Sequence, residues 1–322
     1  MGQLLRGISA SKYIQDSIRT TERRLEEMGM QLWLKANSPI SKDYRPEIDI
    51  SSELDPEKST LYQSLIGSLR WMVEMGRIDI ACEVSMMSSF LAMPREGHLQ
   101  QVLHIFSYLK HHHNSRIIMD PSYPDIKVSK FPDYDWENHY HGYKEEILSN
   151  VPEALSLEMV IRAFVDVDHA GDLLTRCSRT GFIIIVNSAP IYWLSKRQNL
   201  VETSSFGSEF LAMKHCCEYI HGLRYKIRMM GIPMTHGAFV YGDNQSVLWN
   251  TTYPDSVLKK KSNSVAYHFV REGCSVNEWK TTYCRTAWNP SDLLTKSLPA
   301  GENRRRKVRF IMYDIYPDKS DL

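Results

Sequence analysis

The 322-residue sequence has little of what identifies several common classes of protein. Its six cysteines include no C-x-x-C pair and no paired spacing, which argues against a zinc site or a disulfide scaffold and favours a reducing compartment. No window approaches the roughly 20 consecutive apolar residues of a membrane span, and the N-terminal residues contain no apolar stretch of signal-peptide length. The formal net charge is only +1, so any surface for nucleic acid must be local. These features predict a soluble protein of the cytoplasm, the nucleus or both.

The first 120 residues predict helices rather than a sheet. Apolar residues recur at helical spacing over 11–30, 62–73, 78–93 and 98–112. The next segment, 121–157, contains four prolines and dense charge, as expected of a linker.

From residue 158 the apolar pattern changes to that of strands. Short apolar runs predict five strands, at 159–165, 181–186, 191–194, 238–242 and 279–284. Helices are predicted over 206–231, 244–250 and 265–274, with a last helix starting at Pro290. This order predicts an α/β domain over 158–300, with a mixed five-stranded sheet flanked by helices. The basic run 304–307 then predicts a basic C-terminal tail over 301–322.

Four acidic residues, Asp166, Glu209, Asp243 and Asp292, lie where these strands end or helices begin. Side chains at the carboxyl ends of strands line the ligand crevice of open α/β sheets. Clustered carboxylates repel one another unless a divalent cation neutralises them. The set therefore describes a two-metal centre that cleaves phosphodiesters. Alternation puts Asp168 on the same face as Asp166, so either could be the first ligand.

Each acid also has an ordinary structural explanation. Asp166 could belong to a polar turn, and Glu209 could be an acid favoured at a helix N-terminus. Asp243 could cap the following helix, and Asp292 occupies the first turn of the last predicted helix. The hypothesis therefore depends on all four occurring together.

Successive segments of the chain resemble copia-type retrotransposon polyproteins. FVDVDHAGD, SKRQNLVETSSFGSEFLAM, VYGDNQSV, YHFVRE and NPSDLLTK are similar to the motifs of their ribonuclease H domain. PEIDISSELDPEKSTLYQSLIGSLRWMVEMGRIDI and MPREGHLQQVLHIFSYLKHHHNSRIIMDPSYP are similar to the end of their reverse transcriptase region. The resemblance implies that residues 1–120 are a helical remnant of the thumb or connection region, and that 158–300 have a ribonuclease H-like fold.

The resemblance also implies an activity, namely hydrolysis of the RNA strand of RNA–DNA hybrids with two Mg²⁺ ions, or with Mn²⁺. By matching motif, Asp166 bridges both ions, Glu209 holds the product-side ion and Asp292 the nucleophile-side ion. Asp243 helps to position the ions and the attacking water. Other retrotransposon proteins are implied as partners, and no oligomeric state is implied.

Several further features bear on the substrate. His169 stands where the family has tryptophan, which affects substrate fit. Candidate contacts to the hybrid are Arg179, Lys196, Gln198 and Asn244.

The aromatic-x-Asp-Asp motif of a polymerase palm is absent from the sequence, so no polymerase activity is expected. The alternatives are a decayed, non-enzymatic transposon remnant that at most binds nucleic acid, and a metal-dependent nuclease that acts on DNA.

Overall fold

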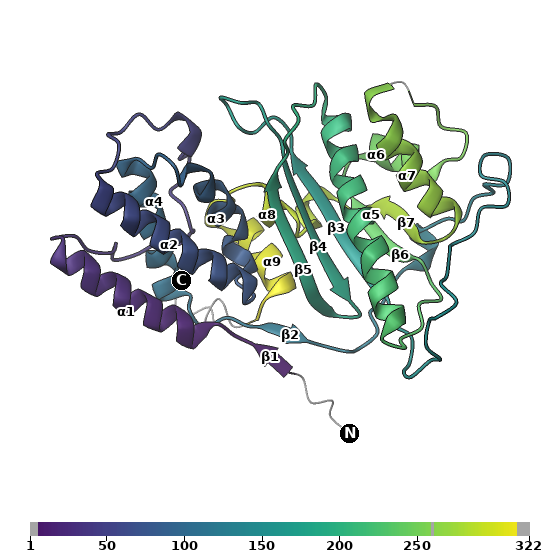
Figure 1. Ribbon diagram of the computed structural model, residues 1–322, viewed down its shortest axis with the longest axis horizontal. Coiled ribbons are helices and arrows are strands. Elements are labelled where there is room, and N and C mark those ends of the chain that lie inside the picture. The colour runs from purple at the N-terminus through teal and green to yellow at the C-terminus, as the bar shows by residue number, and fades with distance from the viewer. Residues whose placement is uncertain (1–5, 259–260, 314–322) are drawn as a thin grey trace. The chain divides into compact units, whose positions relative to one another are not determined.

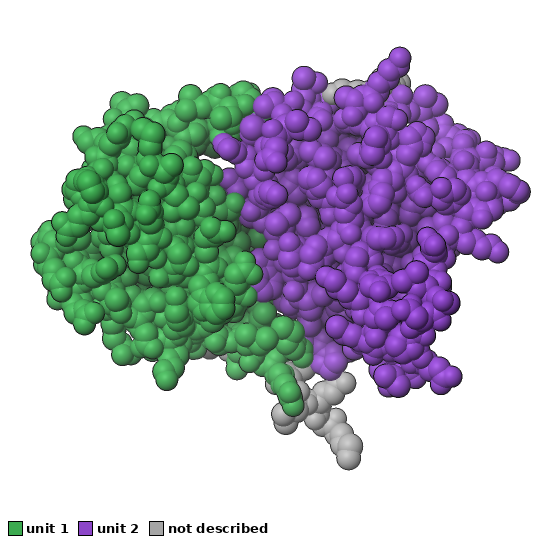
Figure 2. Space-filling view, in the orientation of Figure 1, with its two compact units in different colours: residues 1–119, 172–176, 292–322 green, residues 120–171, 177–291 purple. Residues whose placement is uncertain are grey.

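The computed structural model describes residues 6–258 and 261–313 (Figure 1). Contacts divide the chain into two compact units, which are coloured separately in Figure 2. Unit 1 consists of residues 1–119, 172–176 and 292–322, and unit 2 of residues 120–171 and 177–291. The domain boundaries predicted from the sequence (1–120, 121–157, 158–300 and 301–322) are not tested by this division and stay a prediction. Within the described ranges, no helix is both long enough and apolar enough to cross a membrane.

Unit 1 is mainly helical, as predicted. Its helices are α1 (Ser11–Glu27), α2 (Pro56–Glu74), α3 (Ala81–Met87), α4 (Glu96–His111), α8 (Asp292–Thr295) and α9 (Glu302–Ile311), and its strands are β1 (Arg6–Ile8) and β2 (Ile117–Met119). The two strands pair antiparallel. Helices α1, α2 and α4 pack against one another around fully buried Ile14, Leu69 and Phe106. The apolar stripes of the sequence thus form one hydrophobic core.

Helix α9 occupies part of the segment predicted as a basic tail, of which residues 314–322 lie outside the described residues. Its buried positions are Arg304, Lys307, Val308 and Ile311, which follow helical spacing on one face. Arg304 donates to the backbone oxygen of Asp79 at 2.5 Å and to the Glu83 carboxylate at 3.3 Å. Two of the four inward residues are basic, so a search for an apolar stripe does not detect this helix.

Unit 2 is built on a sheet of five strands. Its strands are β3 (Ile161–Asp168), β4 (Arg179–Val186), β5 (Ala189–Arg197), β6 (Ala238–Gly242) and β7 (Trp279–Tyr283), and its helices are α5 (Ser205–Met229), α6 (Gln245–Thr252) and α7 (Ser264–Ser275). The order across the sheet is β5-β4-β3-β6-β7. The first three strands in sequence form an antiparallel meander, whereas β6 pairs parallel with both β3 and β7. The predicted mixed five-stranded sheet flanked by helices is confirmed.

The core of unit 2 lies between the sheet and α5, which runs along β3 and β4 in Figure 1. Alternate residues of β3, among them Val165 and Val167, pack with Phe210 and other apolar residues of α5. Helix α7 approaches β7 closely at Gly273, where an added Cβ atom would lie 2.0 Å from the Trp279 ring. A larger residue at position 273 would therefore separate these two elements.

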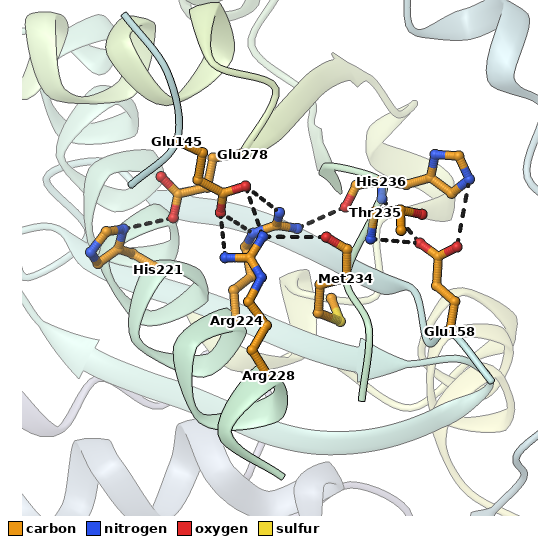
Figure 3. A network of polar contacts seen from close by, with 9 residues as sticks. All are labelled: Glu145, Glu158, His221, Arg224, Arg228, Met234, Thr235, His236 and Glu278. Carbon is orange, nitrogen blue, oxygen red and sulfur yellow. Dashed lines mark hydrogen bonds and ion pairs between the residues drawn. The ribbon is translucent and has the colours of Figure 1, made fainter. Parts of the chain in front are cut away.

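Residues 121–157, predicted as a linker, belong to unit 2 and are attached to it by charged groups. Figure 3 shows that two arginines of α5 donate hydrogen bonds to the carboxylate of Glu145. Arg224 donates to both carboxylate oxygens at 3.1 and 3.0 Å, and Arg228 does so at 2.7 and 2.8 Å. Because the Arg224 side chain is only 1% exposed, its charge needs this partner.

We expect Glu145→Gln to lower the free energy of unfolding by about 3 kcal/mol at neutral pH, because it leaves a buried arginine without its counter-ion. Burial by itself raises the pKa of Glu145, but hydrogen bonds from Arg228 and Arg224 outweigh burial and hold that pKa below its usual value. The folded-state pKa is therefore the lower one, and the stabilisation is fully present above the unfolded-state pKa of about 4.3. It is lost as the pH falls through the folded-state value.

The measurement is urea unfolding of the two proteins from pH 7 to pH 3, with hydrogen exchange over residues 121–157. Glu146→Gln is the matched control, because Glu146 is the exposed neighbouring acid. A loss of stability that is the same at every pH, or equal for both substitutions, would contradict the expectation.

Candidate metal centre

Three of the four predicted acids lie together in unit 2. Asp166, Glu209 and Asp243 each offer one carboxylate oxygen, and these three atoms lie within 4.8 Å of one another. They come from β3, α5 and the residue after β6, elements that are far apart in the sequence. The sequence analysis named these three residues, together with Asp292, as candidate metal ligands, and that role stays a prediction.

The parallel pairing of β3 with β6 brings two of these acids together. Phe164 is the register partner of Tyr241, and continuing that register by two residues places Asp166 beside Asp243. Asp166 is only 1% exposed, so its carboxylate is not an ordinary surface acid. A buried carboxylate needs a proton, a hydrogen-bond donor or a cation nearby.

Glu209 reaches the same place from the N-terminal part of α5. The helix begins after Ser204, whose side chain accepts a hydrogen bond from the backbone N–H of Gly207. Phe210 and Met213 are buried on the side of α5 that faces the sheet, and Glu209 beside them is half-buried. The packing of the two apolar residues thereby sets the direction of the acidic one.

Asp168 was the other possible first ligand, and the structure places it differently. Its carboxylate lies over Gly171, where an added Cβ atom would be 1.8 Å from Oδ2. Among the described residues the acidic group is formed with Asp166 and without Asp168. Alternation along the strand could not distinguish the two, because it gives both the same face.

Two residues that the sequence did not single out support the centre. The backbone N–H of Cys284 donates to the Gly242 oxygen at 2.8 Å, which continues the pairing of β6 with β7. Beyond this link, the hydroxyl of Thr286 donates to Oδ2 of Asp243 at 2.7 Å. The amide of Asn289, which is fully buried, donates to the Val165 oxygen at 2.8 Å, directly before Asp166.

His169 and Gln198 converge on Ser208, the residue before Glu209. Ser208 donates its hydroxyl proton to the Ser205 oxygen at 3.0 Å. A hydroxyl has one proton, so Nδ1 of His169, 3.0 Å from that oxygen, is the donor in their hydrogen bond. Gln198 donates to the Ser208 backbone oxygen at 3.0 Å. Both contacts join the sheet to the start of α5.

The residues predicted to contact a substrate have varied surroundings. Lys196 is exposed on β5, and Arg179, the first residue of β4, donates to the Ser195 hydroxyl at 3.4 Å. Gln198 is buried, and its amide also donates to Thr180 at 2.9 Å. Asn244 caps α6 by accepting from the backbone N–H groups of Ser246 and Val247. A role in substrate binding stays a prediction for all four.

Asp292 belongs to unit 1, where it is the first residue of α8. Its carboxylate is buried, with Lys296 at 3.1 Å from one oxygen and an ion pair to Lys307 through the other. These partners lie in the same unit. Its predicted role as a metal ligand stays a prediction.

The donor set of the three-residue group fits a divalent cation. All three ligand atoms are carboxylate oxygens, which are the donors preferred by Mg²⁺ and Mn²⁺. Three like charges within 4.8 Å repel one another, and a bound cation would relieve this repulsion. These three oxygens could therefore hold a hard divalent cation.

Comparison with known proteins identifies relatives along most of the chain, although no protein-family model matches. The retrovirus-related Pol polyprotein from transposon TNT 1-94 of Nicotiana tabacum is 26% identical over 300 residues, which are 91% of this chain and 19% of that polyprotein. The corresponding polyprotein from transposon RE1 of Arabidopsis thaliana is 26% identical over 253 residues, 79% of this chain and 15% of the polyprotein.

Among solved structures, ribonuclease H1 from Halobacterium salinarum NRC-1 is similar at 14% identity and a TM-score of 0.33. The similarity covers 42% of this chain and 93% of that enzyme. The structure of LC11-RNase H1 in complex with an RNA/DNA hybrid is similar at 13% identity and a TM-score of 0.34, over 43% of this chain and 94% of that one.

The chain spans less than a fifth of the length of the plant polyproteins named above. Its similarity to them nevertheless runs through both units. The homologues of this chain are therefore retrovirus-related Pol polyproteins from plant transposons, which confirms the resemblance to copia-type retrotransposon polyproteins.

Proposed function

We propose that this chain acts as a ribonuclease H, which hydrolyses the RNA strand of RNA–DNA hybrids at the centre formed by Asp166, Glu209 and Asp243. The observation that carries the proposal is the convergence of these three carboxylates from β3, α5 and the end of β6. The homology to transposon polyproteins supports it, because each acid lies in the motif where the resemblance expects one.

The three carboxylates are the residues that would hold Mg²⁺, with Mn²⁺ as an alternative. Such a cation, when bound, lowers the pKa of an attacking water and stabilises the charge on the leaving 3′ oxygen. Thr286 acts on this centre indirectly. Its hydroxyl donates a hydrogen bond to Oδ2 of Asp243, and this hydrogen bond fixes the rotation of that carboxylate. Asn289 holds the backbone directly before Asp166 in the same way.

Basic side chains at one end of β4 and β5 provide a surface for the phosphates of the hybrid. Arg179 is the register partner of Asp168 on one side and of Arg197 on the other. Lys196 neighbours Arg197 and is also exposed. The three cations therefore lie at the end of the sheet that carries the acidic group, where phosphate contacts would position a hybrid. In this proposal Gln198 and Asn244 do not contact the hybrid. Gln198 stabilises the start of α5 and Asn244 stabilises the start of α6.

Asp166→Asn should abolish cleavage of a labelled RNA–DNA hybrid in Mg²⁺. We expect a loss of at least about 100-fold, since even outer-sphere partners of a metal ligand contribute about 10–100-fold. The products of the wild-type protein should carry 5′ phosphates. Asp168→Asn is the matched control, because it removes an equal charge two residues away on the same strand, and it should retain most of the activity.

The same assay separates the proposal from its rivals. A folded wild-type protein that binds the hybrid with an affinity independent of Mg²⁺ and never cuts it would instead be a non-enzymatic transposon remnant. Cleavage of duplex DNA with no preference for the hybrid would indicate a DNA nuclease. Equal activity of the Asp166→Asn variant and the wild type would place the chemistry elsewhere.

Thr286→Ala should weaken the centre without removing a ligand. We expect the Mg²⁺ concentration for half-maximal cleavage to rise by about tenfold, within the range typical of outer-sphere substitutions. Thr286→Ser keeps the donor hydroxyl and should behave as the wild type does. A Mg²⁺ titration of the cleavage rate measures the effect. If the alanine and serine variants require the same Mg²⁺ concentration, the hydrogen bond to Asp243 has no part in the site.

A further inference from the structure

Unit 2 contains a cavity of about 490 Å³, which lies within the roughly 300–1,000 Å³ of sites for small organic molecules. Its walls come from the segment 143–151, from the C-terminal part of α5, and from the end of α7 with the residues that lead into β7. All three walls belong to the same unit. Figure 3 shows polar groups of this region, among them Glu145, His221 and Glu278, which line the cavity.

Large apolar side chains at this cavity are exposed to solvent. Tyr143, Ile147 and Leu148 are 55%, 60% and 45% exposed, and Tyr225 of α5 is 44% exposed. Exposed apolar residues that occur singly need no explanation, whereas several that gather in one place indicate an interaction site. These four side chains therefore offer an apolar surface to the body of a ligand.

The wall formed by α7 and β7 is aromatic and rigid. Trp279 is 1% exposed, and its indole N–H donates to the Val270 oxygen at 2.9 Å. The ring of Phe269 packs against the indole, with the two centroids 5.6 Å apart. Because this aromatic surface is already fixed, a ligand that packs on it loses little free energy to the ordering of side chains.

The carboxylate of Glu278 is the buried polar group of the cavity. The residue is 6% exposed, and Nδ1 of His221 lies 2.6 Å from its Oε1 atom. The His221 side chain is 65% exposed, so solvent screens this contact. Among the described residues, no side chain donates a hydrogen bond to Oε2.

Burial has the largest effect on the pKa of Glu278 and raises it above its ordinary value, although the charge and the hydrogen bond of His221 lower it. The contact with His221 thus compensates only part of the cost of burying this carboxylate. A cation held closer to Oε2 would stabilise the carboxylate further.

The charge of the groups around the cavity also favours a cation. The acidic groups that line it are Glu145, Glu146, Glu272 and Glu278. The cationic groups are Lys144 and Arg228 in the lining and Arg224, which donates to Glu145. Four negative and three positive groups leave a net charge of one negative when His221 is neutral. Both arginines direct their hydrogen bonds to Glu145, and not to Glu278.

We propose that this cavity binds a small organic cation, namely a primary ammonium group carried on an apolar body. The ammonium group donates to Oε2 of Glu278, and the apolar body packs against Tyr225 and the aromatic wall. An uncharged ligand would forgo the charged hydrogen bond, and an anion would be repelled by the carboxylate. The inference does not depend on the proposed function, because Asp166, Glu209 and Asp243 are not among the described residues that line the cavity.

The test compares three ligands that share one apolar body, namely phenethylamine, 2-phenylethanol and 3-phenylpropionate. Binding to the full chain at neutral pH is followed by nuclear magnetic resonance, through the indole N–H signal of Trp279. Phenethylamine should shift this signal with a Kd of about 1 mM or lower, which is ordinary for a ligand of its size. It should bind about tenfold or more tightly than 2-phenylethanol, because hydrogen bonds to charged groups are the stronger ones. 3-Phenylpropionate should bind more weakly than either.

Substitutions then locate the cation. Glu278→Gln keeps the shape of the side chain but removes its charge, and it should weaken phenethylamine binding about tenfold or more while leaving 2-phenylethanol within about twofold. Glu146→Gln is the matched control, because Glu146 lines the same cavity but is exposed, and it should change the affinity for phenethylamine by about twofold or less. Tyr225→Ala should weaken the binding of both ligands about threefold or more, since it removes part of the apolar surface.

Three results would overturn the proposal. The first is phenethylamine that fails to saturate the protein or binds no better than 2-phenylethanol. The second is an advantage of phenethylamine that persists in Glu278→Gln, or that Glu146→Gln lowers equally. The third is unchanged binding of phenethylamine to Tyr225→Ala, and this variant decides the question if Glu278→Gln does not fold, because its side chain is partly exposed. Cleavage of a hybrid is not measured, so failure of the proposed function leaves the outcome unaffected.

Discussion

The parallel pairing of β3 with β6 is the contact on which the candidate centre depends. These strands are separated in sequence by β4, β5 and the long helix α5, and they become neighbours only when this connection has folded. Their common direction means that both carboxyl ends lie at one edge, so the residues that follow them meet. An antiparallel pairing of the same two strands would place Asp166 and Asp243 at opposite ends of the sheet.

The acidic residues of this chain have neighbours of different charge. Asp166, Glu209 and Asp243 lie with other carboxylates and are suited to a cation. Glu145 lies between two arginines, and Asp292 lies between two lysines. Glu145 and Asp292 thus each form two ion pairs within their own unit. Residue type alone would assign all five the same chemistry.

Buried ion pairs of this kind add little net stability, since desolvation offsets much of their attraction, but breaking one is costly. That asymmetry explains what they do here. The ion pairs of Glu145 with Arg224 and Arg228 attach the segment 121–157 to α5, although the segment has few regular elements. The contacts of Arg304 with Glu83 and of Lys307 with Asp292 likewise attach α9 to other parts of unit 1.

The sequence by itself determined the secondary structure of the sheet and the order of the acids. Runs of β-branched residues and helical stripes depend on neighbours a few positions away, and these patterns placed β6 at 238–242, as observed. Tertiary structure decided the contacts between residues that are far apart in the sequence. It brought Asp166 together with Glu209 and Asp243, brought Thr286 to Asp243, and buried the basic face of α9. Glu145 and its two arginines are 79 and 83 residues apart, and no local pattern carries information over that separation.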